Sequence, residues 1–403
     1  MMMSFDYSKL LNEDNSNYFT TWKDIYDDSR SLPNNFLSFL TRSVYLPLNH
    51  YKIIAAYAFI PSALARIVPY LFLWGVSGSG KSTVGKLIAN LHGIDINSSS
   101  DTFAGIRNSL NDRRKRWIEI PSNNPDIPIG ISKEIEVNTC MVWDDVDPSV
   151  FISKGDIYRL FKFGYDRSSD KIEVSSEVTG ENHVFHCFCP KTFSSISPLH
   201  LNDQLKELRR RLIVIPTKRI EDLTEARKAE LGIYGGIWEQ NLLDVSSVKW
   251  KGFSGLFQKY WNLEMASLYL GTRNLLNDYV KGLNSQERAI CMDLIATGVV
   301  CEIWSDEDEA IADIKEYWNW FRGEVKIGES PLLQLLGQLI KQEVKNALHG
   351  GVEVKISNQQ IKAHCQIWYE QGQLLEKPNS KTINQTMNEL GYRLIIGGIW
   401  IKS

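Results

Sequence analysis

The chain has 403 residues, of which 43% are hydrophobic and 11% aromatic, and this composition excludes a protein that is disordered throughout. The length suits two or three domains of roughly 150 residues each. A net charge of −3 gives no general attraction for nucleic acid, so any such binding must come from local basic patches. Six cysteines in so long a chain do not indicate a disulfide framework, and we expect small buried thiols in a reducing compartment.

Residues 1–68 are predicted to form an N-terminal helical collar. The first residues are polar and acid-rich, without a basic leader or an apolar h-region, so we expect a cytoplasmic protein. From residue 31 onward, apolar residues recur at steps of three and four, which indicates helices. The apolar stretch 51–76 is interrupted by Pro61, Arg66 and Pro69, and it lacks the ~20 uninterrupted apolar residues of a membrane span.

Short apolar runs alternate with helical stretches between residues 69 and 220. This is the pattern of a parallel sheet that is covered by helices on both faces, so we predict an α/β domain here. The runs are YLFLW (70–74), CMVW (140–143), VFHCFC (184–189) and LIVIP (212–216).

Two further regions follow the α/β domain. Residues 221–350 are predicted to be a helical lid or linker, which includes TEARKAELG (224–232) and ESPLLQLLGQLIKQEVKNALHGG (329–351). Residues 351–403 contain two short helical patterns and then a ribbon that turns at Gly397 and Gly398. We predict that this last region is a winged helix-turn-helix.

The stretch from Gly75 to Ser82 satisfies G-x-x-x-x-G-K-[ST] in every fixed position, with an apolar run before it and a helical pattern after it. Glycines let backbone N–H groups turn inward at the start of a helix, where they attract phosphate. We expect Lys81 to reach the β- and γ-phosphates of a nucleotide and Ser82 to ligate Mg²⁺. The residues expected to hold the nucleotide are Gly75, Ser77, Gly78, Ser79, Gly80, Lys81, Ser82 and Thr83.

Two acids directly follow the second apolar run, as CMVWDDVD. A phosphate-binding loop of this kind needs an acid at the end of a neighbouring strand for Mg²⁺. We assign Asp144 to the metal side and Asp145 to polarising the attacking water. Because aspartate is shorter than the glutamate often found at the second position, Asp145 predicts slow turnover.

Two later features favour a hydrolase over a nucleotide kinase. The third apolar run is followed by Lys191, Thr192 and Ser194, any of which could sense a γ-phosphate or cap the next helix. An arginine triplet then precedes the last run, and an arginine there could stabilise transition-state charge in a neighbouring subunit. We prefer Arg211 for this role, with Arg210 second; the alternative is a solvated basic edge.

The order of these motifs resembles the ATPase domain of AAA+ proteins. The segments are the phosphate-binding loop, WDD, GYDRSSDK, FHCFCPKTF and RRRLIVIP, over residues 35–220. They resemble most closely the superfamily III-like domains of phage and plasmid primase-helicases and a related family of unknown function. The resemblance implies a five-stranded core that binds ATP and Mg²⁺ and works as a ring or other homo-oligomer with shared sites.

DNA is the expected partner, through two regions. Residues 171–186 predict a hairpin, and in superfamily III helicases a hairpin at this place grips DNA with basic residues, whereas the tip here carries Glu181 and Asn182. In the winged helix, Lys381 and Asn384 could contact phosphates, although such a module also serves for protein assembly. A basic cluster at 113–117 could contact a phosphate backbone or be a solvated helix end.

The leading hypothesis is therefore an oligomeric, Mg-ATP-dependent ATPase of the helicase or translocase type, acting on DNA in the replication of a mobile element. An ATP-controlled assembly switch with slow hydrolysis, as in transposition or defence, is the alternative. A small-molecule kinase is a third, which the arginine triplet and the long helical tail disfavour. No primase constellation is visible in the sequence.

Overall fold

The computed structural model describes residues 20–402 apart from several short segments. Those segments are 99, 121–130, 148, 154, 176–181, 203–204, 220, 222, 224–242, 277–282, 329–330, 351–355, 371–376 and 396–397. The N-terminal acid-rich stretch before residue 20 and the predicted helix 224–232 thus lie outside the described residues. The chain divides into two compact units, residues 1–317 and 318–403, and each is described by itself.

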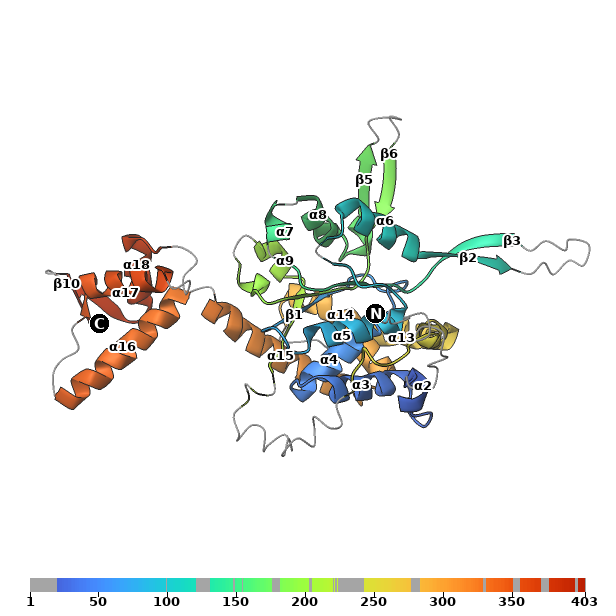
Figure 1. The fold of residues 1–403 in the computed structure, drawn as a ribbon, viewed down its shortest axis with the longest axis horizontal. Coiled ribbons are helices and arrows are strands. Elements are labelled where there is room, and N and C mark those ends of the chain that lie inside the picture. Colours follow the sequence, from blue (N-terminus) through green and yellow to red (C-terminus); the bar gives the residue numbers. More distant parts are fainter. Residues whose placement is uncertain are drawn as a thin grey trace, which may run out of the picture. The chain divides into compact units, whose positions relative to one another are not determined.

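The first unit is built on a four-stranded, fully parallel sheet with strand order β4-β7-β1-β8 (Figure 1). With its many helices it forms a mixed α/β structure that is compatible with a nucleotide-binding fold. The resemblance implied five strands; in place of a fifth, Asn97 makes a single parallel bridge to Trp143 on the outer side of β4. The strands are β1 (Tyr70–Trp74), β4 (Met141–Trp143), β7 (Lys191–Ser195) and β8 (Leu212–Pro216).

Helices cover both faces of this sheet, because successive side chains of a strand point to opposite faces. On one face, Thr192 of β7 donates a hydrogen bond to the hydroxyl of Tyr57 at 3.2 Å. On the other, the ring of Phe193 packs against Phe161 with 5.3 Å between the ring centroids. The covering helices are α4 (Leu48–Ala58) and α5 (Lys81–His92) on the first face, and α7 (Ser149–Ser153) and α8 (Gly155–Phe163) on the second.

The third sheet strand differs from the prediction. The first half of the apolar run 184–189 lies in β6 (Asn182–His186), which pairs antiparallel with β5 (Lys171–Ser175) as the returning arm of the expected hairpin. The sheet strand is β7, which starts after Pro190 and is fully buried although it reads KTFSS. Its polar groups are hydrogen-bonded inside the protein, so burying them costs little free energy. Because the strand is polar in sequence, a search for apolar runs does not detect it.

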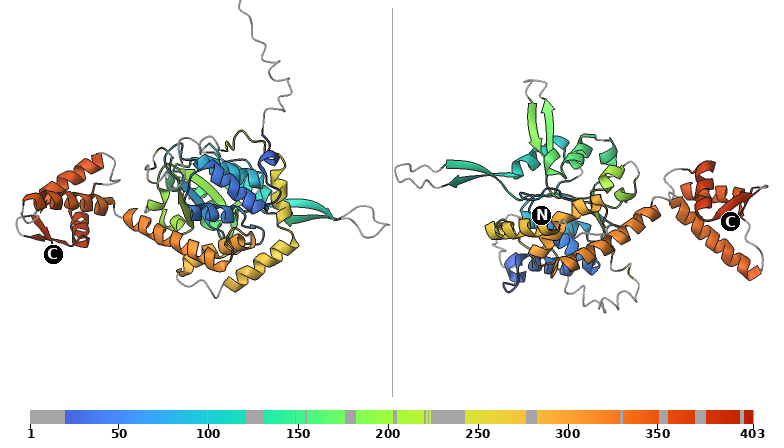
Figure 2. Two further views of the ribbon diagram at one scale, coloured as in Figure 1. Left: turned by 90° about the horizontal axis from the view of Figure 1, so that it is seen from below. Right: turned by 180° about the vertical axis from the view of Figure 1, so that it is seen from behind.

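A second hairpin was not predicted. It consists of β2 (Lys115–Ile120) and β3 (Ile131–Glu136), and it follows helix α6 (Phe103–Arg113). Both hairpins project from the body of the first unit (Figures 1 and 2). Their connecting residues, 121–130 and 176–181, are outside the described part, and so is the expected tip residue Glu181.

The remaining helices of the first unit pack around the sheet. The N-terminal helices contact later ones directly: Phe39 lies 6.1 Å from Phe253, and Phe59 lies 5.6 Å from Phe257, between ring centroids. The regions predicted to divide at residues 68 and 220 therefore share one core. These helices are α2 (Trp22–Ile25), α3 (Leu32–Ser43), η2 (Arg167–Ser169), η3 (Leu199–Leu201), α9 (Lys206–Arg209), α12 (Phe253–Tyr260), α13 (Leu263–Leu276), α14 (Ser285–Val300) and the start of α15 (Glu307–Gly328).

Strand β8 forms one edge of the sheet. The backbone N–H of Val214 on its outer side donates a hydrogen bond to the hydroxyl of Tyr317 at 2.6 Å, and Tyr317 is almost completely buried. A residue from α15 thus satisfies a backbone donor that an edge strand would otherwise leave open.

Within the described residues, the second unit contains the end of α15, the three helices α16, α17 and α18, and a three-stranded antiparallel sheet of order β10-β11-β9. Leu336 and Leu339 of α16 share a core with Ile361, Met387 and Trp400. The boundary predicted at residue 350 therefore falls inside a packed core, and the helix before it belongs to the C-terminal unit. The elements are α16 (Pro331–Gly350), β9 (Ile356–Ser357), α17 (Asn358–Glu370), α18 (Ser380–Glu389), β10 (Tyr392–Ile395) and β11 (Ile399–Lys402).

All six cysteines are free and buried, in agreement with the absence of a disulfide framework in the prediction. Within the described ranges, no helix has both the length and the apolar content that a membrane crossing requires.

Candidate functional site

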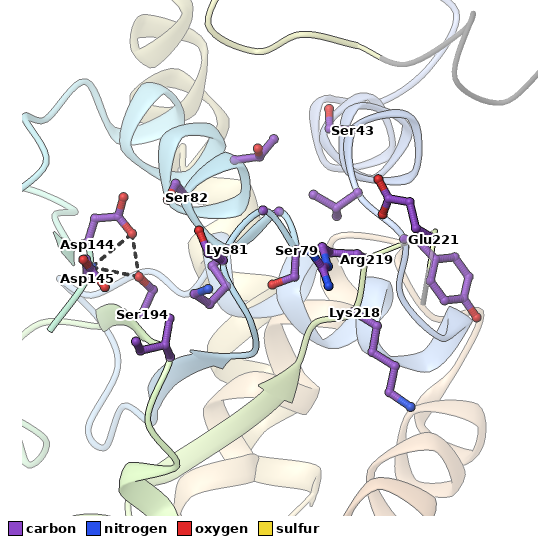
Figure 3. A pocket seen from close by; sticks show the side chains of 17 residues that line it. Ser43, Ser79, Lys81, Ser82, Asp144, Asp145, Ser194, Lys218, Arg219 and Glu221 are labelled. Carbon is purple, nitrogen blue, oxygen red and sulfur yellow. Dashed lines mark hydrogen bonds between the residues drawn. The ribbon is translucent and has the colours of Figure 1, made fainter. Parts of the chain in front are cut away.

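The chain segments that follow the four parallel strands meet at the carboxyl edge of the sheet and border a cavity of about 790 Å³. The loop after β1 leads into α5, and two acids follow β4, while Ser194 and Thr217 come at the ends of β7 and β8. Figure 3 shows Lys81 and Ser82 in the middle, Asp144, Asp145 and Ser194 on one side, and a second charged group on the other. Parallel strands bring their carboxyl ends to one edge, so residues far apart in sequence converge there.

The loop between β1 and α5 uses its glycines for two different reasons. Gly78 and Gly80 have φ of +77° and +89°, in the left-handed region that favours glycine. Gly75 has an ordinary backbone, but a Cβ on it would lie 2.3 Å from the carbonyl oxygen of Thr217. A Cβ on Gly80 would also lie 2.6 Å from a methyl carbon of Val44, so the N-terminal region closes against this loop.

Lys81 is the first residue of α5 and folds back over the loop. Its Nζ donates to the carbonyl oxygens of Gly75 and Val76, both at 2.8 Å, and little of the residue is exposed. Burial lowers the pKa of Lys81, while the nearby charges of Asp144 and Asp145 act in the opposite direction. The ammonium group therefore lies within electrostatic reach of both acids, inside the predicted phosphate cradle.

Ser194 positions the two acids. Its hydroxyl donates to Oδ1 of Asp144 at 2.5 Å and accepts from the backbone N–H of Asp145 at 2.9 Å. Asp145 has a left-handed backbone with φ of +53°, a conformation that aspartate tolerates better than most residues. Because β7 lies between β1 and β4 in the sheet, Ser194 stands between the loop and the acids.

Of the three sensor candidates, only Ser194 lines the cavity. Lys191 starts β7, at the opposite end of the strand, and is completely buried. Its Nζ donates to the carbonyl oxygens of Gly164, Cys187 and Cys189 at 3.1, 2.7 and 3.2 Å. The prediction that Lys191 senses a γ-phosphate is therefore corrected. Because the strand begins where it was expected to end, this lysine lies at the amino edge of the sheet and bonds to backbone carbonyls there.

The arginine triplet is also corrected. Arg211 is only 8% exposed; it donates to the carbonyl oxygen of Phe161 at 3.2 Å and covers the ring of Tyr165 at 4.1 Å. Arg210 is about half exposed and pairs with Glu207. Arg211 is thus engaged inside its own subunit, and Arg210 is the member of this pair that a neighbouring molecule could reach.

Sequence reasoning missed the other wall of the cavity. Ser43, Val44 and Tyr45, at the end of α3, line it from the N-terminal region. No motif marks them, because they belong to the site only through packing. The segment after β8 lines the cavity on the same side, with Lys218, Arg219 and Glu221 (Figure 3).

Arg219 lies close to the loop. A Cβ placed on Gly78 would be 3.8 Å from Cδ of Arg219, and Figure 3 draws the arginine beside Ser79. The preceding Thr217 bonds to the hydroxyl of Ser79 at 2.7 Å, so the two segments are joined side chain to side chain. The sequence signal was available: a basic pair follows a core strand at the same edge as the predicted loop.

The predicted metal-side residues Ser82 and Asp144, together with Thr83, line the same cavity. Within the described ranges, no group of three or more His, Cys, Asp or Glu side chains is arranged to hold a metal ion. A cation here would therefore take ligands from a bound phosphate or from water as well as from the protein.

The candidate nucleic-acid residues are not among those that line this cavity. Lys381 on α18 is exposed and Asn384 is half-buried. In the basic cluster, Arg113 ends α6 and Lys115 begins β2, while Arg114 between them is engaged by Glu136 and Asp170. Arg114 is therefore not available for a phosphate backbone.

Comparisons with known proteins add little to this geometry. No family model matches the chain, and no curated protein matches it. Among solved structures, the chain is similar to one described as SCCmec type IV Cch, an active helicase, with 16% sequence identity and a TM-score of 0.37. The match covers 94% of this chain and 72% of the other.

Proposed function

We propose that the protein is an ATPase that requires Mg²⁺ and acts on DNA as a helicase or translocase. The observation that carries this proposal is the convergence of Lys81, Ser82, Asp144, Asp145 and Ser194 around one cavity at the carboxyl edge of a parallel sheet. The volume of about 790 Å³ is within the range of small-molecule and cofactor sites.

The residues present fit Mg-ATP. The loop provides backbone N–H groups at a helix N-terminus, where phosphate is favoured, and the positive φ of Gly78 and Gly80 opens the backbone toward it. Lys81 would exchange its bonds to two loop carbonyls for bonds to phosphate oxygens. Ser82 and Asp144 would hold Mg²⁺, which when bound would neutralise charge on the phosphates.

Hydrolysis would depend on Asp145 and on how it is held. Its carboxylate would accept a hydrogen bond from the attacking water, while Ser194 fixes its backbone. On the other side of the cavity, Arg219 adds a positive charge close to Gly78, which would favour the negatively charged nucleotide. Arg219 is therefore proposed as an additional nucleotide-binding residue.

A homo-oligomer, as a ring or filament, would complete the site. No arginine of the triplet lines the cavity of its own chain. Arg210, which is exposed, replaces Arg211 as our candidate for stabilising transition-state charge in the neighbouring subunit. Glu207, its present partner, would release it when the subunits meet.

The C-terminal unit supports an interaction with DNA. Residues 318–403 contain ten Lys and Arg against seven Asp and Glu, whereas residues 1–317 contain 35 against 41. We infer a winged helix from the element order α16-β9-α17-α18-β10-β11, with α18 as recognition helix and Arg393 exposed on β10. A basic module attached to an acidic body would direct nucleic acid to the module.

An ATP-controlled assembly switch is the second candidate. It is favoured by Asp145, which is shorter than glutamate and starts from a constrained left-handed backbone. Hydrolysis would then be slow, and nucleotide binding itself would control association of the subunits.

The test is phosphate release with Mg-ATP, in the absence and presence of single- and double-stranded DNA. The variants are Lys81→Ala, Arg210→Ala and a chain that ends at residue 317, with Arg159→Ala as a control because Arg159 is an exposed arginine of α8 that pairs with Asp156. If the protein is a motor, DNA raises the rate of ATP hydrolysis severalfold. Lys81→Ala and Arg210→Ala each abolish this hydrolysis. Mixing Lys81→Ala with Arg210→Ala then restores part of the activity, because each supplies what the other lacks.

Two results would redirect the proposal. If the protein binds ATP and assembles but hydrolyses negligibly with or without DNA, the assembly switch replaces the motor. If Arg210→Ala keeps full activity, the site is complete within one chain and the shared-site arrangement is abandoned.

A further inference from the structure

The bases of the two projecting hairpins meet in one cluster of charged and titratable side chains. Arg114 immediately precedes β2, Glu136 ends β3, Asp170 immediately precedes β5 and His186 ends β6. Each of the four strands thus has one of these residues in it or directly beside it, at the end nearest the body of the protein. We call these four residues the hairpin node.

Arg114 is the residue that touches both hairpins. Its Nε donates to Oε1 of Glu136 at 2.9 Å, and its Nη1 pairs with Oδ2 of Asp170. Nδ1 of His186 lies 3.1 Å from the same oxygen of Asp170. A planar guanidinium can serve two carboxylates at once from fixed directions, so this connection specifies orientation as well as attraction.

Two of the four side chains of the node are largely removed from solvent, whereas those of Glu136 and His186 are 32% and 27% exposed. The side chain of Asp170 is 5% exposed and that of Arg114 is 12% exposed. Burial would lower the pKa of Arg114, but hydrogen bonds and charges from Glu136 and Asp170 outweigh it, so that pKa is raised. Screening by water and salt, which weakens surface ion pairs, is therefore reduced for the pair of Arg114 and Asp170.

Two contacts connect the node to the strands of the central sheet. Arg167 pairs with Glu136 at 2.7 Å and donates from Nε to the carbonyl oxygen of Ala65 at 2.9 Å, just before β1. The carbonyl oxygen of Asp170 accepts from the backbone N–H of Cys187 at 3.0 Å, and Cys187 is in turn bound by Lys191 of β7. The opposite ends of β1 and β7 carry the phosphate-binding loop and Ser194.

We propose that the hairpin node couples the two hairpins into one unit, with Arg114 as the positioning residue that joins them. A disturbance at the base of one hairpin then loosens the other, although the two are separate in sequence and their described strands form two separate sheets. The use of this coupled pair on DNA rests on the proposed function, whereas the coupling itself does not.

The test is amide hydrogen exchange of the full chain, without nucleotide, in Asp170→Asn. This change removes one charge at the base of the β5–β6 hairpin and keeps the side-chain shape. Exchange in β2 and β3 is expected to accelerate at least about fivefold together with β5 and β6, because both hairpins lose the same anchor. The matched control is Glu173→Gln, an exposed acid of β5 outside the node, which is expected to leave β2 and β3 unchanged.

Acceleration confined to β5 and β6 in Asp170→Asn would overturn the coupling. If that variant unfolds as a whole, Arg114→Lys decides, since it keeps the charge but not the two-sided guanidinium geometry. Faster exchange in both hairpins of Arg114→Lys supports the proposal, and faster exchange in one hairpin alone, or in neither, contradicts it.

A second arm separates this inference from the proposed function. A non-hydrolysable ATP analogue with Mg²⁺ is added to the wild-type chain, and exchange is followed in both hairpins. A change in both supports the coupling, and a change in one alone contradicts it. If neither hairpin changes, nucleotide binding does not affect the node, and a connection between the nucleotide site and the hairpins is removed from the proposed function. The coupling of the hairpins is still decided by the variants.

Discussion

The two ends of the central sheet carry similar side chains in opposite settings. At the carboxyl end, Lys81 and Arg219 border an open cavity that three carboxylates also line. At the amino end, Lys191 and Arg211 are buried and donate to carbonyl oxygens of their own chain. Whether a cation next to a core strand is a lysine or an arginine therefore does not indicate if it can contact a ligand. The end of the strand at which the cation lies decides this.

Lys81→Ala is the strongest test of this difference between the two ends of the sheet. If the carboxyl end is the reactive one, ATP hydrolysis falls about 10²- to 10³-fold, as when one electrostatic donor is removed from an active site. The fold should survive, because the lysine bonds only to its own loop. Phosphate release and thermal unfolding measure the two effects, with Lys86→Ala, an exposed contact of the same helix, as control. Equal activity in both variants would refute the assignment.

Lys191→Met tests the opposite end. It removes a buried donor from three carbonyl oxygens, and we expect unfolding to become easier by about 3 kcal/mol, with hydrolysis per folded molecule nearly unchanged. Urea unfolding gives the first quantity and phosphate release, corrected for folded fraction, the second. A large loss of turnover without a loss of stability would mean that Lys191 acts in the reaction after all.

Arg219→Ala sharpens the comparison within the cavity. Since Arg219 lies beside Gly78 but outside the motif, its loss should weaken nucleotide binding about tenfold and leave maximal turnover almost intact. Titration with a fluorescent ATP analogue measures the affinity. The neighbouring Lys218→Ala serves for comparison, and an unchanged affinity in Arg219→Ala would remove Arg219 from the site.

Lys52 provides a third setting, a partly buried cation in an ion pair, with the smallest expected effect. Its bond to Glu309, together with hydrogen bonds from Ser305, lowers the pKa of Glu309 to about 2. Because this pKa is below that of the unfolded chain, the pair stabilises the fold above about pH 4.5, and the stabilisation is lost as pH falls toward 2. Glu309 is about a third exposed, so solvent screening limits the gain to about 0.5 kcal/mol.

Glu309→Gln measures this gain. Its deficit in unfolding free energy against the wild type should be present at pH 7 and shrink on acidification. A deficit that grows as the pH falls would contradict the assigned sign.

The sequence predicted those parts of the site that depend on contiguous chemistry. The loop from Gly75 to Ser82 and the acids after β4 are local patterns, and their convergence follows from parallel strands. Their chemical roles stay predictions. Ser194 was among three candidates, and only the location of β7 separates it from Lys191.

The remainder depended on packing that no local pattern encodes. Strand β7 reads KTFSS because its polar groups find partners in Tyr57, Asp144 and neighbouring carbonyls, and apolar periodicity cannot detect such a strand. Val44 enters the site through contact with Gly80, 36 positions later along the chain. Helix α16 was recognised as a helix, but only its contacts with α17 and α18 assign it to the C-terminal unit.

The hydrogen bond between the hydroxyl of Tyr317 and the backbone of β8 has a practical consequence for work with fragments. A fragment cut at the predicted limits, 69–220, would lose this cap and also the N-terminal wall formed by Ser43 to Tyr45. It would present an uncovered strand edge on which a second molecule could add its own strand, the first step of aggregation. Insoluble material from such a fragment would therefore report a missing cap, and expression to at least residue 317 is required before activity is judged.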